Sequence, residues 1–377
     1  MTVYDTPSPV TPSTRPSLSS RWSEWAGYAA AAWSLVYGML GLFWTFGGAG
    51  FPFGVGHDEQ AREVSLLEKA TPHTVGPVIA VLGIAAAGLA LVTIRRRRRE
   101  LSPFPSVVAA TLAVGLAVVI PDYRPLLAVV RLPILTVGAP FDWPEQVGLS
   151  DFLSLFMPWP VANQILLMVG GLLWWATAVT WWRRSRSACL NCGRRASTHD
   201  AATVESAVRW GRRAVLVAVA IPLLYAATRW AWVMNIPLGL SREGIRIGAR
   251  EMPGVWIGGA LLATMGAMGA LLTLGLIQRW GEVYPGWIPR LRGKPVRPRT
   301  AIIPASVVSI LIGSAGLMFV RAAILGSIEI DSETWGLTVP QLFWPLWSVA
   351  LAGATFAYNL RRRGPCDRHQ VPNPDAD

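Results

Sequence analysis

Long apolar stretches separated by short polar segments cover almost the whole chain. A helix needs roughly 20 mainly apolar residues to cross a bilayer, because it rises about 1.5 Å per residue. Eight stretches reach or approach this length, and we predict that each forms a membrane-spanning helix. They are 25–46, 75–94, 104–121, 160–182, 211–233, 254–278, 301–320 and 338–360. The pattern therefore predicts an all-α membrane protein with about eight spans.

Two further segments carry weaker patterns. The stretch 125–139 is apolar but short, and it contains Pro125, Arg131 and Pro133. We interpret it as a re-entrant or interfacial piece, because a crossing there would reverse every later loop. The segment 61–70 has the residue spacing of a short amphipathic helix, which we place on the outer surface.

Composition supports lipid as the solvent of these stretches. Only 15% of the residues are charged and 52% are hydrophobic, whereas a soluble domain carries about 25% charged residues. The net charge of +12 comes from short basic runs between the apolar stretches. This distribution argues against nucleic acid as a partner and is typical of loops beside a membrane. The partner that composition predicts is the lipid bilayer.

The basic runs also predict an orientation. With both termini and every second loop in the cytoplasm, 25 of the 34 Arg and Lys residues lie on the cytoplasmic side. Short cytoplasmic loops carry such an excess in multi-pass proteins. We therefore expect a multi-pass protein of the cytoplasmic membrane. Residues 1–20 are rich in Pro, Ser and Thr and are predicted to form a disordered cytoplasmic leader.

The two halves of the chain share landmarks, which indicates an internal repeat. A motif recurs at a constant offset: Arg21, Trp22, Ala26, Ala30, Ala32, Leu35, Tyr37 and Trp44 match Arg209, Trp210, Ala214, Ala218, Ala220, Leu223, Tyr225 and Trp232. Each half then ends with a Trp-Pro pair, an Ala-Thr pair, an Arg cluster and a cysteine. Four crossings in each half predict parallel repeats. Chance similarity between two Ala- and Trp-rich helices is the other interpretation.

This interpretation divides the chain into five parts. The leader 1–20 precedes a first four-helix membrane repeat at 21–183, and a cytoplasmic linker follows at 184–208. The second four-helix repeat is 209–360, and a cytoplasmic tail covers 361–377.

The cysteines and one histidine have the spacing of a metal site. Cys189 and Cys192 form a Cys-x2-Cys pair followed by glycine, and Cys366 and His369 form a Cys-x2-His pair at the matching place of the second half. Four such ligands can close a tetrahedral structural zinc site. A redox pair at Cys189 and Cys192, or three unrelated thiols, are the alternatives. The zinc hypothesis predicts that the metal ties the tail to the central linker.

Three arginines lie at or near the outer ends of apolar segments: Arg131, Arg229 and Arg321. Charges inside a membrane indicate function by default, and these three predict an outer site for an anionic small molecule or lipid. The competing interpretation is that long side chains near helix ends reach the headgroups. None of the eight spans contains an acidic residue, which argues against proton-driven transport.

The sequence contains no motif for a known reaction. It lacks H-E-x-x-H, G-x-S-x-G, a P-loop and a dinucleotide fingerprint, so no catalytic residue is predicted. The segments 224–232, 278–285 and 344–347, together with the Arg-rich tail that carries cysteine, resemble a family of actinobacterial multi-pass membrane proteins. That resemblance implies the membrane topology and no activity. His369 departs from the Cys-x2-Cys ending that members of the family often have.

Three functions stay open at this stage. The first is a transporter-like or ligand-binding membrane protein, with a polar cavity between the halves. The second is a membrane scaffold or sensor, whose zinc-stapled cytoplasmic module and basic loops contact a cytoplasmic protein. A lipid-modifying enzyme is the third, and it has the least support because no nucleophile–base pair is visible.

Overall fold

The computed structural model describes residues 22–62, 64–95, 102–138, 157–190, 192–194, 200–286, 288–328 and 330–363. The regular structure of these residues is helical, apart from one isolated bridge between Val283 and Pro295. The α-helices are α1 (Trp22–Thr45), α2 (Pro72–Arg95), α3 (Phe104–Val114), α4 (Arg124–Gly138), α6 (Trp159–Ser185), α7 (Asp200–Val233), α8 (Arg242–Glu251), α9 (Val255–Leu274), α10 (Pro298–Ile324), α11 (Trp335–Leu342) and α12 (Trp344–Arg361). A π-helical turn, η4 (Gly115–Val119), extends α3.

Six of these helices are long and apolar enough to cross a membrane: α1, α2, α6, α7, α9 and α10. A seventh span is present if the bent pair formed by 104–119 and 124–131 counts as one. Many of their large apolar side chains are exposed, including Val81, Leu216 and Leu272, as expected where lipid surrounds the helices. The chain is therefore a multi-pass helical membrane protein, while the predicted count of eight spans is not reached by these helices.

The difference arises in two predicted spans that contain breaks. The span predicted at 104–121 ends before Pro121, and the chain then turns by 64° into α4. The span predicted at 338–360 is divided into α11 and α12 at Phe343. Pro345 explains this division, because it has no amide to donate to Gln341 and its ring clashes with that carbonyl. The remaining helix α12 has 18 residues, about 27 Å at the standard rise.

Two short elements differ from the sequence expectation. The amphipathic helix predicted at 61–70 is wrong: the described residues there form turns after a 3-10 turn at Glu59–Ala61. Conversely, α8 was not predicted. Its N-terminus is capped by Ser241, whose hydroxyl accepts a hydrogen bond from the amide of Gly244 at 3.1 Å, and Ile245 is its buried contact residue.

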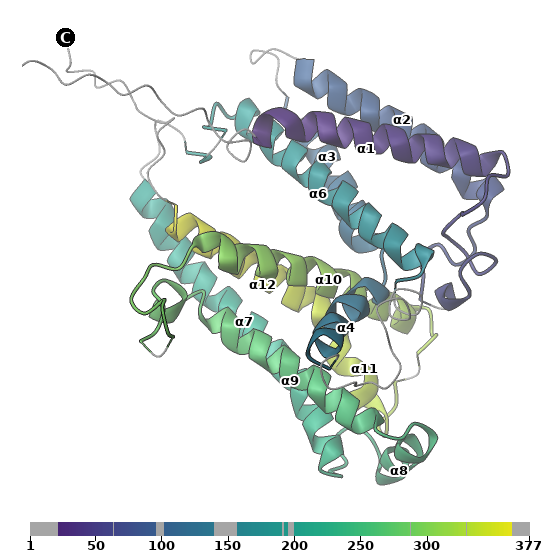
Figure 1. Cartoon of the computed structure of the whole chain (residues 1–377), viewed down its shortest axis with the longest axis vertical. Helices are drawn as coiled ribbons and strands as arrows, with labels where there is room; N and C mark the ends of the chain where they lie inside the picture. Colours follow the sequence, from purple (N-terminus) through teal and green to yellow (C-terminus); the bar gives the residue numbers. More distant parts are fainter. Residues whose placement is uncertain are drawn as a thin grey trace, which may run out of the picture.

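The long helices form two groups with the same order of packing (Figure 1). In the first group α1 packs against α2 and α6, and α3 packs against α6. In the second group α7 packs against α9 and α12, and α10 packs against α12. Alanine and glycine at the contacts let the backbones approach closely; Ala30, Ala90, Ala218 and Ala354 are fully buried.

The two groups meet through the third long helix of each. Helix α10 contacts η4 and α4, and a Cβ added at Gly313 of α10 would lie 3.2 Å from Cγ1 of Val118. The hydroxyl of the buried Ser314 faces the carbonyl oxygen of Asp122 at 3.4 Å. Close packing between the groups is thus concentrated near the break between η4 and α4.

Polar contacts collect at two opposite ends of the helices. At the end we call the arginine end, Trp181 donates to the carbonyl of Ser102, and Arg362 donates to that of Val296. At the other end, the far end, Arg124 contacts Asp58 and Trp159 donates to the carbonyl of Gly50. The described residues in these contacts that the sequence assigns to one side of the membrane lie at the same end. Which end faces the cytoplasm stays a prediction.

Candidate functional site

One wall of the candidate site is a stripe of side chains along α6. Trp175, Ala178, Val179 and Trp182 recur at helical spacing and line the same cavity, because residues three and four apart lie on one face of a helix. The stripe continues past the apolar part of α6 into Arg183 and Arg186. One face of α6 therefore carries an apolar wall that ends in two positive charges.

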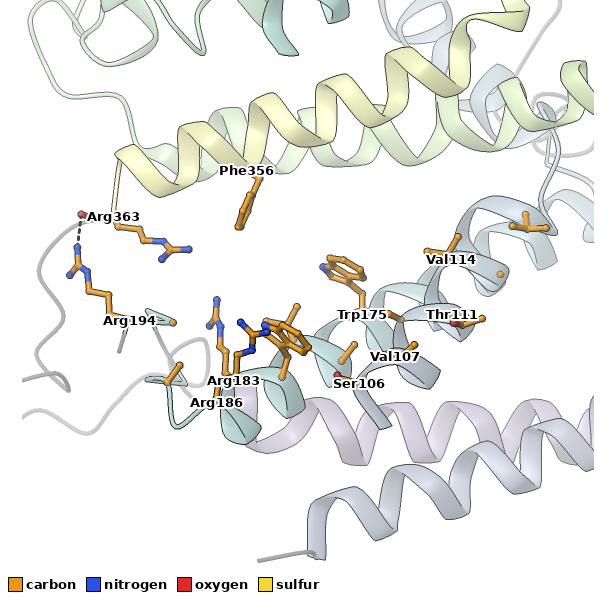
Figure 2. Close-up of a pocket in the computed structure, with 18 residues that line it drawn as sticks. Ser106, Val107, Thr111, Val114, Trp175, Arg183, Arg186, Arg194, Phe356 and Arg363 are labelled. Carbon is orange, nitrogen blue, oxygen red and sulfur yellow. Dashed lines mark hydrogen bonds between the residues drawn. The ribbon is translucent and has the colours of Figure 1, made fainter. Parts of the chain in front are cut away.

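The cavity has a volume of about 970 Å³ and lies between the two helical groups. Its second wall is the face of α3 and η4 that runs from Ser106 to Val119, a length of roughly 20 Å at the rise of a helix. Phe356 of α12 faces this wall from the second group (Figure 2). The cavity is mainly apolar along its length, as sites for small molecules in proteins usually are.

Four arginines surround one end of the cavity: Arg183 and Arg186 from the end of α6, and Arg194 and Arg363 from the segments that follow α6 and α12 (Figure 2). Nη1 of Arg183 donates to the carbonyl of Leu190 at 2.7 Å. The guanidinium carbon of Arg186 lies 3.9 Å from the centroid of the Trp182 ring. Within the described residues, no acidic side chain lines this cavity. Four basic side chains therefore lie together at this end of the cavity.

The structure describes two of the four predicted zinc ligands, Cys189 and Cys192, and both lie beside these arginines. Cys189 and Cys192 are half-buried on a turn in which the amide of Gly193 donates to the carbonyl of Cys189 at 2.8 Å. Gly193 has a φ of +74°, a left-handed conformation that a residue with a Cβ rarely adopts. Cys366 and His369 lie outside the described residues.

The described residues alone do not complete a metal site. Among them, no three His, Cys, Asp or Glu side chains come together in a way that holds a metal ion. The four-ligand zinc site therefore stays a prediction, because it needs Cys366 and His369.

A second polar cluster lies at the far end, and we call Asp58, Asp122, Arg124 and Gln164 the ion cluster. Nη2 of Arg124 lies 2.6 Å from Asp122 Oδ2, and Nη1 lies 2.8 Å from Asp58 Oδ2. The amide of Gln164 donates to Asp122 Oδ2 at 2.8 Å. Asp122 is 0% exposed, Arg124 6% and Asp58 8%. Two carboxylates thus share one buried guanidinium.

The local sequence explains how the ion cluster forms. Pro121 ends the helix that contains η4, and Asp122 then accepts a hydrogen bond from the amide of Arg124 at 2.9 Å. This turn directs the carboxylate of Asp122 and the side chain of Arg124 to the same place. Gln164 from α6 also accepts from the amide of Asp122 at 3.1 Å, so the break in the helix is bonded to a neighbouring helix.

The three arginines of the predicted outer anion site have different surroundings. Arg131 lines a cavity of about 310 Å³ beside the ion cluster, together with Gln60, Tyr123 and Arg124. Arg229 and Arg321 do not line this cavity. Arg321 donates to the carbonyl of Val64.

Arg229 joins α7 to the start of α11. Its Nη1 donates to the carbonyl of Gly336 at 2.8 Å, and its guanidinium carbon lies 4.2 Å from the centroid of the Trp232 ring and 4.5 Å from that of Tyr225. Arg229 is 8% exposed, and its guanidinium donates to the backbone carbonyls of Gly336 and Leu337 in the first turn of α11. Its contacts therefore support a structural role in this conformation.

Sequence reasoning missed two features. Arg124 was not named as a site residue, although a charged pair directly after Pro121 and between apolar segments was a signal for a buried cluster. The cavity arginines were counted only as part of the basic loops. Their signal was the continuation of an apolar helical stripe of α6 into Arg183 and Arg186.

Together, the apolar helices, the two ends rich in polar contacts and the cavity between the helical groups define a polytopic α-helical membrane protein. No protein-family model matches the chain, and no curated protein or solved structure matches it either.

Proposed function

We propose that the chain is a transporter-like membrane protein that binds a ligand in the cavity between two four-helix repeats. The observation that carries this proposal is the cavity of about 970 Å³, with its apolar walls and its four arginines at one end. A scaffold does not need such a cavity, because helices that serve only to pack against one another fill their interface with side chains.

The order of packing supports the repeat. Helices α1, α2, α3 and α6 contact one another in the same pattern as α7, α9, α10 and α12. The fourth helix of each group also starts with a Trp-Pro pair, at Trp159 and Trp344. This arrangement requires α12 to count as an eighth crossing, with α11 as its broken outer part. A binding site between two repeats is common in transporter folds.

The closed far end supports alternating access. There, α10 packs on η4 and α4, and Arg321 contacts the carbonyl of Val64 in the loop after α1. The cavity is bordered at the other end by arginines of the segments that we place in the cytoplasm. This conformation fits a transporter whose cavity opens toward the cytoplasm and is closed toward the outside.

A labelling experiment tests this proposal. Val107 lines the cavity and is 57% exposed, whereas Val92 on α2 is 48% exposed and does not line it. Each lies three residues from the arginine end of its helix. We expect a membrane-impermeant maleimide to label Val107→Cys in inside-out vesicles, and to label neither Val107→Cys in intact cells nor Val92→Cys in either preparation. Peptide mapping by mass spectrometry distinguishes the label from that on native cysteines.

The result that contradicts the proposal is Val107→Cys labelled no more than Val92→Cys in inside-out vesicles. That outcome means a dry interface between the helical groups and favours the scaffold. Labelling of Val107→Cys from intact cells alone would instead reverse the proposed orientation.

A second proposal is the zinc staple between linker and tail, which the scaffold hypothesis uses. The observation that favours it is the contact between Nη2 of Arg194 and the carbonyl of Arg363 at 3.5 Å. Arg194 follows Cys192 by two residues, and Arg363 precedes Cys366 by three. Described residues close to each of the two predicted ligand pairs thus lie side by side.

Metal analysis tests the staple. Protein purified without a histidine tag is expected to contain about one zinc ion per chain, because four ligands fill a tetrahedral site. Cys192→Ser and Cys366→Ser are each expected to lose the metal. His199 is a linker histidine outside the two predicted ligand pairs, so His199→Gln is expected to keep it. Protein without zinc, or equal zinc in all variants, would exclude the four-ligand site.

A further inference from the structure

The segment that joins α9 to α10 is strongly basic. Residues 279–299, which we call the α9–α10 loop, contain six basic residues and one acidic residue, Glu282. The basic residues are Arg279, Arg290, Arg292, Lys294, Arg297 and Arg299, and all six are exposed. Glu282 lies 3.7 Å from Arg361 of α12, so its charge is already offset. The loop therefore presents a concentrated positive charge at the arginine end.

Hydrogen bonds hold the α9–α10 loop in one shape. The amide of Val296 donates to the carbonyl of Glu282 at 2.9 Å and pairs the two arms of the loop. The hydroxyl of Tyr358 donates to the carbonyl of Gly281 at 2.7 Å. Nη2 of Arg362 donates to the carbonyl of Val296 at 2.8 Å. Both arms are thus bonded to the end of α12, and this order lowers the entropy cost of binding a partner.

The loop lies beside the lipid-facing surface of two spans. Leu272, near the end of α9, is 67% exposed, and Ile303 in α10 is 59% exposed. Arg299 lies one turn before Ile303 in the same helix, so their side chains share a face. Figure 1 shows the loop at the end of the molecule where α12 ends. Because lipid surrounds the exposed apolar residues of α9 and α10, the loop lies at the level of the headgroups.

Two properties of the loop favour lipid over an acidic protein as its partner. Clusters of roughly four to eight Lys and Arg directly beside a span attract anionic lipids. The loop also exposes two apolar side chains among its charges, Val283 at 45% and Leu291 at 39%. Segments that lie in the interface gain both from burying such side chains among lipids and from attraction to anionic headgroups. Charge and apolar surface therefore match the same partner.

We infer that the α9–α10 loop is a binding surface for anionic phospholipid headgroups of the membrane leaflet at the arginine end. Its guanidinium groups and Lys294 donate to the headgroups, and Val283 and Leu291 contact the lipid beneath them. No described residue of the loop lines the cavity of about 970 Å³. This surface is separate from the proposed ligand site and does not depend on it.

Competition between two lipids tests this inference. The full chain, purified in detergent, is mixed with equal amounts of phosphatidylglycerol and phosphatidylcholine, and native mass spectrometry gives the ratio of the two bound lipids. We expect the parent chain to retain mainly phosphatidylglycerol. Arg292→Gln/Lys294→Gln/Arg299→Gln is expected to lower this ratio about 100-fold, since each basic residue near an anionic membrane surface contributes a factor of roughly five.

Helix α8 supplies a matched control for charge. It also exposes three arginines, Arg242, Arg246 and Arg250, but two glutamates in the same helix offset most of their charge. It precedes α9, whereas the α9–α10 loop follows it, so the two lie at opposite ends of this helix (Figure 1). Arg242→Gln/Arg246→Gln/Arg250→Gln is expected to retain phosphatidylglycerol like the parent chain.

Hydrogen exchange places the lipid on the chain. In nanodiscs of phosphatidylcholine that contain phosphatidylglycerol, backbone amides of 283–297 are expected to exchange more slowly than in nanodiscs of phosphatidylcholine alone. Amides of α8 are expected to exchange equally in both.

Three outcomes would overturn the inference. Equal retention of the two lipids by the parent chain would favour an acidic protein as the partner of the loop. An equal fall in the ratio for both triple variants would mean that overall charge, and not the loop, attracts the lipid. An unchanged ratio in the loop variant, or unchanged exchange at 283–297, would place the anionic lipid elsewhere on the chain. Labelling of Val107→Cys reports separately on the proposed function, because these variants leave the cavity lining intact.

Discussion

Replacement of Arg124 by methionine is expected to destabilise the protein by about 3–5 kcal/mol, the usual cost of removing one partner from a buried ion pair. Methionine keeps much of the side-chain volume and removes the charge that Asp58 and Asp122 share. Both carboxylates are nearly inaccessible to water, so neither is solvated when the guanidinium is absent. Thermal unfolding in detergent, followed by tryptophan fluorescence, measures the effect.

An exposed ion pair and a neutral ion cluster serve as controls. Arg246 contacts Glu243 at 3.1 Å, but both side chains are 60% exposed, so Arg246→Met is expected to cost less than about 1 kcal/mol. The triple variant Asp58→Asn/Asp122→Asn/Arg124→Met has no charge in the cluster and is expected to recover much of the loss. If Arg124→Met unfolds at the temperature of the parent chain, the cluster is not buried as described.

Replacement of Gly83 by leucine is expected to separate α1 from α2. A Cβ at Gly83 would lie 2.6 Å from the Cα of Gly38 and 2.7 Å from the carbonyl oxygen of Ser34. Both neighbours are backbone atoms, which cannot rotate away as a side chain can. The expected destabilisation is about 3 kcal/mol, at the upper end of the usual cost of overpacking, and thermal unfolding in detergent measures it.

Gly88 provides the control on the same helix. A Cβ at Gly88 meets nothing within 4 Å, so Gly88→Leu is expected to leave the unfolding temperature close to that of the parent chain. Leucine also favours the helix over glycine. Similar losses in Gly83→Leu and Gly88→Leu would mean that a large side chain anywhere on α2 is destabilising, and that the contact between α1 and α2 does not explain the effect.

The helices themselves were largely predictable. Each of the eight predicted spans overlaps a helix, because the need to place apolar residues in lipid acts on consecutive residues. The predicted helix boundaries were less accurate where a proline interrupts the hydrogen bonds of a helix. Pro345 divides the last predicted span at Phe343, and Pro121 leads to the bend before α4.

The candidate sites were predictable only in part. Arg131, Arg229 and Arg321 were noticed as charges near the membrane, yet each has different contacts in the folded chain. Asp58 and Arg124 are separated by 66 residues, and no local pattern relates them. The zinc ligands follow from spacing alone, and their assembly depends on a tail beyond the described residues.

By itself, the sequence determined that this is a multi-pass helical membrane protein and where its apolar helices lie. These properties depend on the solvation of consecutive side chains, which can be summed along the chain. Only the tertiary structure decided that Arg124 is shared by Asp58 and Asp122, and that Arg183, Arg186, Arg194 and Arg363 surround one apolar cavity. Those properties depend on which helix faces meet. Glycines that approach residues far apart in the sequence, such as Gly83 at Gly38 and Gly313 at Val118, determine which faces do so.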